Sequence, residues 1–197
     1  MNLGEMREWV LRTIGRPERL QQALDSINSA IEYVTAKGDF ASDLIENSCN
    51  LSSSVYIHAI DITTTMPRFR KIKYLRPDGY SVYLKWKDSS RVFVEKAPGV
   101  GTELIDVWYR AGNQLLIKLS VLQSILHFGY YIFPERLVDT ADEYWMLDQM
   151  PTVIHAFAVA LEYESIGNES EASRYDKKAE RFLFVHKSDK QDAVSHS

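Results

Sequence analysis

The chain has 197 residues, of which 45% are hydrophobic, and a formal net charge of -4 at pH 7. This length predicts one domain, or one domain with an insertion, with enough apolar residues for a buried core. The acidic balance argues against a general nucleic-acid-binding protein but is compatible with a local basic patch. A single cysteine, Cys49, excludes an internal disulfide framework and a cysteine-rich zinc site, and it suits a reducing compartment.

No stretch of the sequence has the uninterrupted apolar length that a membrane span needs. The best candidate, residues 115–133, is broken by Lys118, Gln123 and His127. The first eight residues include acids and no hydrophobic block, so they do not resemble a secretory signal. We therefore expect a cytosolic product with no membrane partner.

The N-terminal segment predicts two amphipathic helices. Residues 5–14 place Met6, Trp9, Val10 and Ile14 on one face, and Gly15 ends this helix. We expect Pro17 to lie in the first turn of a second helix, which runs to about residue 36 before Gly38. Its apolar stripe has helical spacing and consists of Leu20, Leu24, Ile27, Ile31 and Val34.

From about residue 51 the hydrophobic period changes to two, which predicts strands. The residues that alternate with their neighbours at this period are Val55, Ile57 and Ala59, then Ile72 and Tyr74, then Val82, Leu84 and Trp86. Pro77-Asp78-Gly79 is a turn signal, so residues 69–87 are expected to form a hairpin. Residues 91–95 predict a further strand, and residues 115–119 and 125–133 another pair.

The C-terminal third predicts a helical hairpin. Pro151 opens the first helix, the chain breaks at residues 166–168, and a second helix follows. Asn168 and Glu171 have the spacing of a capping box. Residues 188–197 are polar and lack aromatics, so we expect them to be disordered in isolation.

The order of these elements predicts an α+β protein. We expect a helical bundle formed by the N- and C-terminal helix pairs, with an inserted antiparallel β-sheet domain. The expected divisions are a helix pair over residues 1–48, a β-rich region over 49–135, a helical hairpin over 136–187 and a polar tail over 188–197.

The residues that most often carry chemistry form no recognisable motif. The five histidines show no metal-binding pair at helical spacing and none neighbours Cys49, so His58 and His127 are interpreted as structural. A metal site built from distant residues remains an alternative. Ser52-Ser53-Ser54 lacks nucleophile-elbow glycines, and Gly99-Val100-Gly101 lacks the third glycine and the lysine of a phosphate loop. Acidic residues near a predicted helix start complement its dipole, and these are Asp139, Asp142 and Glu143. We predict no catalytic, cofactor-binding or metal-binding residues.

The strand region has the opposite charge balance from the rest of the chain. Between residues 68 and 96, nine basic residues face only Asp78, Asp88 and Glu95. One interpretation is a solvated sheet face with lysines that discourage edge pairing; the other is a surface for DNA phosphates or an acidic partner. Tyr74 and Trp86 are expected on the core side, which argues against a platform for stacking single-stranded bases. The basic residues are Arg68, Arg70, Lys71, Lys73, Arg76, Lys85, Lys87, Arg91 and Lys96.

A pattern of small, aromatic and turn residues extends through the C-terminal hairpin. It comprises Met150-Pro151, Ala156, Ala160-Leu161-Glu162-Tyr163, Gly167-Asn168, Ala172, Tyr175 and Phe182. Tyr130-Tyr131-Ile132-Phe133-Pro134 lies upstream, and Gly38-Asp39-Phe40 ends the opening helix pair. This pattern resembles the head-to-tail adaptor proteins (portal-binding connectors) of tailed bacteriophages. Tetratricopeptide repeats use a similar hairpin, but this chain has no second copy at the required spacing.

The resemblance implies a structural virion protein of the neck, assembled in the host cytoplasm, without enzymatic activity or cofactor. Such adaptors form a dodecameric ring beneath the portal, extend the DNA channel and provide the docking platform for the tail. The implied partners are the portal protein, a tail or nozzle protein, neighbouring copies in the ring and double-stranded DNA in transient passage.

Two sets of residues would serve these contacts. The C-terminal segment would dock on the portal through Phe182, Phe184, Val185, His186, Lys187, Asp189, Lys190 and Gln191. The strand region would contact ring neighbours, the tail or the channel through Arg68, Arg70, Lys71, Lys73, Lys85, Lys87 and Arg91. The alternative function is a helical-hairpin protein–protein interaction module of a cytosolic protein, and an enzyme with a distributed active site is the third.

Overall fold

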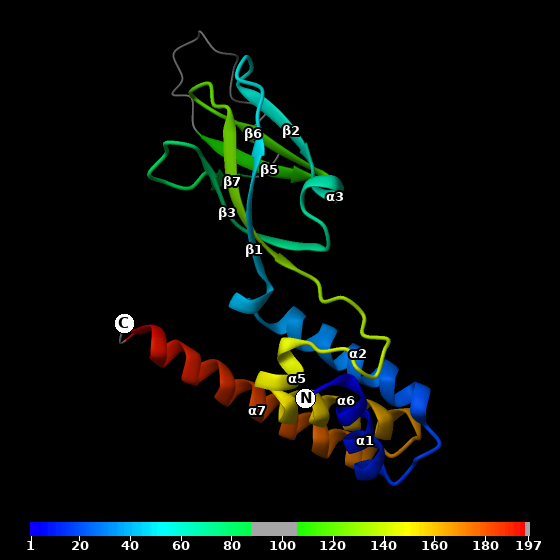
Figure 1. The fold of residues 1–197 in the computed structure, drawn as a ribbon. Helices are drawn as coiled ribbons and strands as arrows, with labels where there is room; N and C mark the ends of the chain where they lie inside the picture. The colour runs from blue at the N-terminus through cyan, green and yellow to red at the C-terminus, as the bar shows by residue number, and fades with distance from the viewer. Residues whose placement is uncertain (88–105, 196–197) are drawn as a thin grey trace. The chain divides into compact units, whose positions relative to one another are not determined.

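The computed structural model describes residues 1–87 and 106–195, with side chains to residue 187. The chain is a mixed α+β protein with helices and two β-sheets. It divides into two compact units, one of Met1–Ser42 with Pro134–Ser197 and one of Asp43–Phe133. We call them the helical unit and the sheet unit, and Figure 1 shows each with its own set of elements.

The helical unit begins with two helices, α1 (Leu3–Ile14) and α2 (Leu20–Lys37). Asn2 and Glu5 form a capping box at the start of α1, and Gly15 ends that helix with a left-handed φ of 67°. The prediction that Pro17 lies in the first turn of the second helix is wrong, because α2 begins at Leu20.

Three further helices complete this unit: α5 (Trp145–Gln149), α6 (Pro151–Ser165) and α7 (Glu169–Ser195). Pro151 occupies the first turn of α6, as expected. The turn before α7 uses Gly167 at φ 76°, and the side chain of Asn168 accepts a hydrogen bond from the Glu171 N–H at 3.3 Å. The prediction of disorder from Ser188 onward is wrong for most of that segment, since the α7 backbone is helical to Ser195.

Helix α6 lies at the centre of the helical unit. Every residue from Val153 to Ala160 is buried, because α6 packs against α1, α2, α5 and α7. A helix that is apolar all round is stable only when it is covered on all sides. The core around it is completed mainly by Leu3, Met6, Val10, Ile27, Ile31, Val34, Met146 and Leu147.

A buried ion pair connects the start of α2 to the end of α6. Glu162 is only 1% exposed, and its carboxylate accepts hydrogen bonds from Arg19 Nε at 2.7 Å and from the Ser26 hydroxyl at 2.7 Å. Arg19 also donates to the Ser165 hydroxyl. Because each charge has a partner, the pair fixes how α2 and α6 pack against each other.

The segment that follows Pro134, where the chain re-enters the helical unit, is held to α2 by Asn28. Its buried side chain donates to the Leu137 carbonyl at 3.0 Å and accepts from the Leu137 N–H at 2.8 Å. The acids that follow do not begin a helix as predicted, because α5 starts only at Trp145. Instead, the Asp142 carboxylate accepts from the N–H groups of Val138 and Asp139 and closes a turn.

A 3-10 turn η1 (Ala41–Asp43) leads from the helical unit into the sheet unit, which contains a short helix α3 (Ile62–Thr65). The first sheet of this unit has the order β1-β7-β3 and the second the order β2-β6-β5-β4. The strands are β1 (Leu44–Asn50), β2 (Ile57–Asp61), β3 (Phe69–Pro77), β4 (Lys85–Trp86), β5 (Val107–Ala111), β6 (Gln114–Lys118) and β7 (Ile125–Ile132). All pairs are antiparallel except β4 with β5.

The expected strand pairings are wrong although most strands are in place. β3 pairs with β7 and β4 with β5, so residues 69–87 are not a hairpin. Likewise β6 pairs with β2 and β5, not with β7. The Pro77-Asp78-Gly79 turn exists, with Gly79 at φ 75°, but the chain leaving it joins the second sheet. A local turn signal does not specify which strand supplies the next hydrogen-bonding edge.

Several apolar residues of the alternating runs are exposed. Ile57 is 64% exposed while its neighbours His58 and Ile60 are buried, so the alternation of β2 is real but inverted. A shift of one residue exchanges the two faces of a strand. Val82 and Trp86 are also exposed, and only Leu84 of that run is buried. The predicted strand 91–95 and the Gly99–Gly101 segment lie outside the described residues.

Candidate binding surfaces

The residue types that bind metals are dispersed in the described part of the chain. There, no group of three or more His, Cys, Asp or Glu side chains is arranged to hold a metal ion. Among the helices searched, none has both the length and the apolar composition needed to cross a membrane. His127 faces Asp78, with Nε2 at 3.2 Å from a carboxylate oxygen, and His58 is buried in β2.

His155 is buried on α6 against α1. Its ring stacks on Trp9 with 4.0 Å between centroids, and its Nε2 lies 2.9 Å from the Thr13 hydroxyl oxygen. Because that hydroxyl donates to the Trp9 carbonyl, its oxygen is left to accept from the Nε2–H of a neutral imidazole. Burial, together with the nearby positive charge of Lys178, lowers the pKa of His155 from 6.5 to about 4. His155 therefore stays uncharged at neutral pH and serves packing.

The C-terminal part of α7 carries the residues predicted to dock on a portal. Phe184 is 73% exposed and Val185 is 49% exposed, and we call these two the α7 apolar patch. Figure 1 shows this end of α7 extending past α6.

The neighbouring members of the predicted docking set are held differently. Phe182 packs against the core of the helical unit, and Lys187 donates to the Lys37 carbonyl at 2.6 Å. His186 is half-buried. Asp189, Lys190 and Gln191 belong to the helical backbone of α7, and their side chains lie outside the description. Within the predicted docking set, Phe182 and Lys187 hold α7 to the rest of the helical unit, whereas Phe184 and Val185 form exposed apolar surface.

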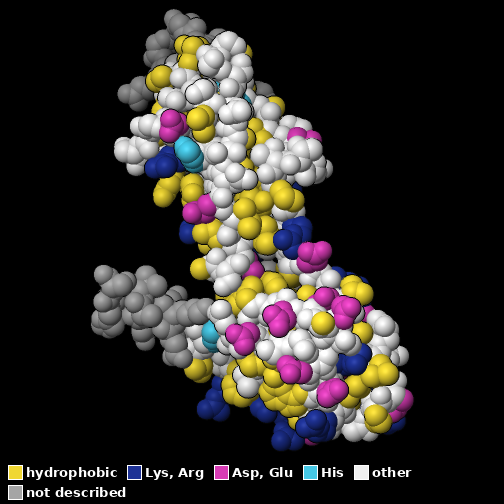
Figure 2. Space-filling view, in the orientation of Figure 1, with side chains coloured by type: hydrophobic (Ala, Val, Ile, Leu, Met, Phe, Trp, Pro, Cys, Tyr) yellow, Lys and Arg dark blue, Asp and Glu magenta, His cyan; other side chains and the backbone are white. Residues whose placement is uncertain are grey.

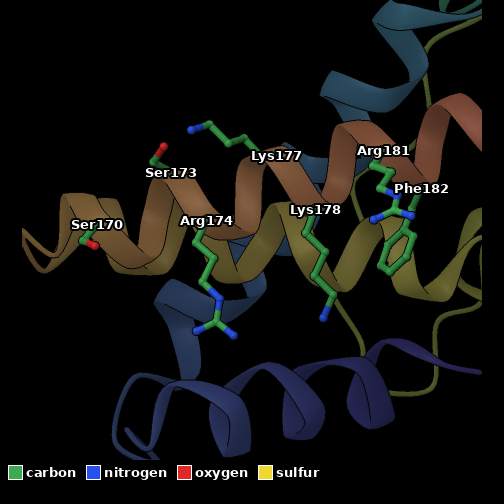
Figure 3. Close-up of a pocket in the computed structure, with 7 residues that line it drawn as sticks. All are labelled: Ser170, Ser173, Arg174, Lys177, Lys178, Arg181 and Phe182. Carbon is green, nitrogen blue, oxygen red and sulfur yellow. The ribbon is translucent and has the colours of Figure 1, made fainter.

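A basic stripe follows α7 that the sequence reasoning missed. Arg174, Lys177, Lys178 and Arg181 recur three and four residues apart, which places them on one side of the helix. They line a shallow depression of about 750 Å³ together with Ser170, Ser173 and Phe182, and Figure 3 shows the basic side chains one after another along α7. Their spacing of three and four residues within a predicted helix is the signal in the sequence that identifies them. We call these four residues the basic face of α7.

A second depression lies between α2, α6 and α7 and differs in character. It has a volume of about 680 Å³ and an apolar floor that includes Ala30, Phe157 and Ala160. Its rim carries three exposed acids, Glu164, Glu169 and Asp176. We call it the acidic groove. Figure 2 shows Asp and Glu side chains dispersed over the visible face of the helical unit, with Lys and Arg gathered at its lower edge.

The predicted basic patch of the sheet unit is split by the strand pairing. Lys71 and Lys73 are exposed on β3 of one sheet, whereas Lys85 belongs to β4 of the other, with Lys87 just after it. Arg70 lies over the Tyr131 ring, 5.3 Å from its centroid. Arg68 has a positive φ of 55°, and its carbonyl accepts from the Phe133 N–H. Arg91 lies outside the described residues.

The structure reveals an aromatic cluster on one face of the first sheet. Tyr74 lies over Gly129 of β7 so closely that an added Cβ there would meet its ring at 2.5 Å. Tyr83 stacks on Tyr74 with 4.9 Å between centroids, and the Tyr74 hydroxyl donates to Glu46 of β1 at 3.0 Å. Desolvation of the hydroxyl, with that hydrogen bond to Glu46, raises the pKa of Tyr74. The prediction that Tyr74 and Trp86 face the core is wrong, since Tyr74 packs outside it and Trp86 is exposed.

Comparison with known proteins finds neither a matching family model nor a matching curated protein.

Proposed function

We propose that this protein is a structural head-to-tail adaptor of a tailed bacteriophage virion. In this proposal, the terminal helix pairs form one helical bundle and the sheet region is an insertion in it. Copies of the protein form a ring beneath the portal, extend the DNA channel and provide the docking platform for a tail or nozzle protein. The protein acts by binding and not by catalysis.

The observation that carries this proposal is the exposed apolar patch on a long terminal helix. Helix α7 has 27 residues against 15 for its partner α6, so it reaches beyond the hairpin it forms. Near that end, Phe184 and Val185 expose large apolar side chains. Apolar side chains grouped on a surface commonly mark protein–protein contact. The patch coincides with the segment that adaptors of this kind use to engage the portal.

The basic residues of the sheet unit have a second role in the proposal. Lys71 and Lys73 on β3, and Lys85 and Lys87 around β4, would contact acidic groups of a ring neighbour or of the tail. DNA must move freely through the channel. Many lysine–phosphate contacts acting together would bind the DNA too tightly for it to move. We therefore assign most of these residues to protein contacts.

Binding to portal rings of the same virus tests the proposal. The wild-type protein should assemble on the ring, detected by mass photometry and negative-stain microscopy. The double variant Phe184→Ala/Val185→Ala should bind at least tenfold more weakly per copy, because truncating a buried aromatic anchor removes about 2 kcal/mol or more. The symmetry of a ring amplifies such a loss.

The matched control is Val138→Ala, which truncates an apolar side chain that is 75% exposed on the same unit but outside α7. It should bind as the wild type does. Wild-type protein that fails to bind any portal ring, yet forms a stable small oligomer, would contradict the adaptor and favour the helical-hairpin interaction module. Equal binding by the double variant and the wild type would reject the role of the α7 apolar patch.

A further inference from the structure

The basic face and the acidic groove lie on different sides of the same helix. Successive α-helical residues are about 100° apart, so Asp176 and Lys177 point in different directions from adjacent positions. The three- or four-residue spacing of Arg174, Lys177 and Arg181 continues one side, and the seven-residue spacing of Glu169 and Asp176, two helical turns, continues another. The helical unit therefore carries a positive surface and a negative surface on adjacent sides of α7, with Ser173 lining both depressions.

The basic face has charges available for a partner. Arg174 already pairs with Glu171 at 3.3 Å, whereas Lys177 and Arg181 are exposed and neither forms an ion pair with another residue that the structure describes. Lys178 lies over the rings of Tyr175 and Phe182, 5.4 Å and 5.7 Å from their centroids. The face thus combines exposed positive ends with an aromatic side chain, as Figure 3 shows for Phe182 beside Arg181.

The acidic groove offers the complementary features. Phe157 and Ala30 beneath the groove are 3% and 0% exposed, so the apolar surface that a partner can contact comes from Tyr33, which is 40% exposed, and from the partly exposed Leu161 and Ala172. Tyr33 packs edge-on against Phe157 and its hydroxyl donates to Glu180 at 3.0 Å, which holds α2 and α7 at the groove. Lysine and arginine can lay their aliphatic stems on such a surface while their charged ends meet acids at the rim.

We infer that the acidic groove receives the basic face of α7 from a second copy of this chain. We assign the groove of each copy to one neighbour and its basic face to another, which makes the contact heterologous. A head-to-tail contact of this kind repeats into a ring or a filament, whereas a reciprocal contact of the same two surfaces would close as a two-fold dimer. It would supply the subunit contact of the ring and to that extent rests on the proposed function.

Two charge-reversed variants test the contact without any portal. In Lys177→Glu/Arg181→Glu the basic face becomes acidic, and in Glu164→Lys/Asp176→Lys the groove becomes basic. Equal amounts of wild-type protein with ordinary and heavy nitrogen are mixed at low salt and treated with a carbodiimide, which joins lysines to carboxylates at contact distance. Mass spectrometry then distinguishes links between copies from links within one copy.

The wild type should give links between copies that join Lys177 or Lys178 to Glu164, Glu169 or Asp176. Sedimentation velocity measures the fraction of associated protein. For each variant alone, this fraction should be at least tenfold lower than for the wild type. An equimolar mixture of the two variants should regain this association, since opposite charges face each other again. Raising the salt to about 1 M, where screening extends over only about 3 Å, should weaken the wild-type association.

Glu8→Lys/Glu18→Lys is the matched control, because it makes the same change of net charge at exposed positions outside the groove. It should associate as the wild type does, and circular dichroism checks that every variant is folded. The inference fails if the mixture of variants does not recover association, or if the control loses as much as the groove variant. A third outcome also contradicts it: the wild type gives no links between copies but binds a DNA duplex, and Lys177→Glu/Arg181→Glu does not bind that duplex. The basic face would then be a binding surface for DNA phosphates.

If the copies do not associate through the groove, portal binding through Phe184 and Val185 is unaffected as a proposal. If the protein does not bind a portal, the contact between copies is likewise unaffected. The two proposals are therefore separable by experiment.

Discussion

Replacing Glu162 with glutamine should destabilise the helical unit far more than its single-atom change suggests. The Glu162 carboxylate is 1% exposed and accepts from Arg19 and Ser26, each at 2.7 Å. Glutamine keeps one acceptor oxygen but removes the charge, which leaves the Arg19 guanidinium without its counter-ion. Breaking a buried ion pair costs about 3–5 kcal/mol. Because the Arg19 side chain is 21% exposed and keeps some water, we expect about 2–3 kcal/mol.

The assay is thermal unfolding followed by helical circular dichroism, since the helical unit has its own core. For a unit of about 100 residues, this loss should lower Tm by roughly 10 °C. Glu164→Gln, two residues away and exposed, is the matched control and should change the stability by less than about 0.5 kcal/mol. Replacing both partners, Arg19→Met with Glu162→Leu, should restore much of the stability, because no unpaired charge is then buried. A melt of Glu162→Gln identical to that of the control would refute the reasoning.

Three further predictions concern a buried histidine, a glycine and an asparagine. Because the pKa of His155 falls from 6.5 to about 4 on folding, protonation favours the unfolded state; the unfolding free energy should be constant above pH 6.5 and decline by about 3 kcal/mol as the pH falls to 4. Denaturation curves of His155→Phe, which does not titrate there, should lack this component, and an unchanged slope would contradict the assignment. Gly129→Ala should cost about 1–3 kcal/mol in urea unfolding of the sheet unit, since the added Cβ would lie 2.5 Å from the Tyr74 ring. In a Tyr74→Ala background the same change should be nearly neutral, and a cost unaffected by that background would disprove the steric explanation. Asn28→Ala should lower the stability of the helical unit by about 2–4 kcal/mol, because it leaves the buried N–H and C=O of Leu137 unsatisfied. A melt like that of the wild type would show that water replaces both hydrogen bonds.

The local elements of the helical unit were predictable from the sequence because their signals are local. Gly15 ends α1, Pro151 opens α6, and Gly167-Asn168 separates α6 from α7. Each signal acts through backbone geometry within a few residues, so it operates independently of what packs nearby. The length of α7 was not predicted, since the polar composition of its last turns resembles that of a disordered tail.

The tertiary structure alone decided which strands pair, which faces are buried and which side chains share a surface. Pro77-Asp78-Gly79 predicted a turn correctly, yet β3 and β4 joined different sheets. Pairing between distant strands depends on the whole apolar surface that they bury together, and a shift of one residue reverses the face that is covered. Ile57 illustrates this, since its strand was predicted and its orientation was not.

The candidate surfaces follow the same division. The four basic residues of α7 have helical spacing and could be read from the sequence, because a helix arranges them without help from other elements. The acidic groove combines Tyr33 of α2, Phe157 of α6 and Asp176 of α7, which are brought together only when the three helices pack. The sequence by itself thus determined the helices and the charges they carry. Packing decided where a positive face and a negative groove lie, because it depends on contacts between residues far apart in the chain.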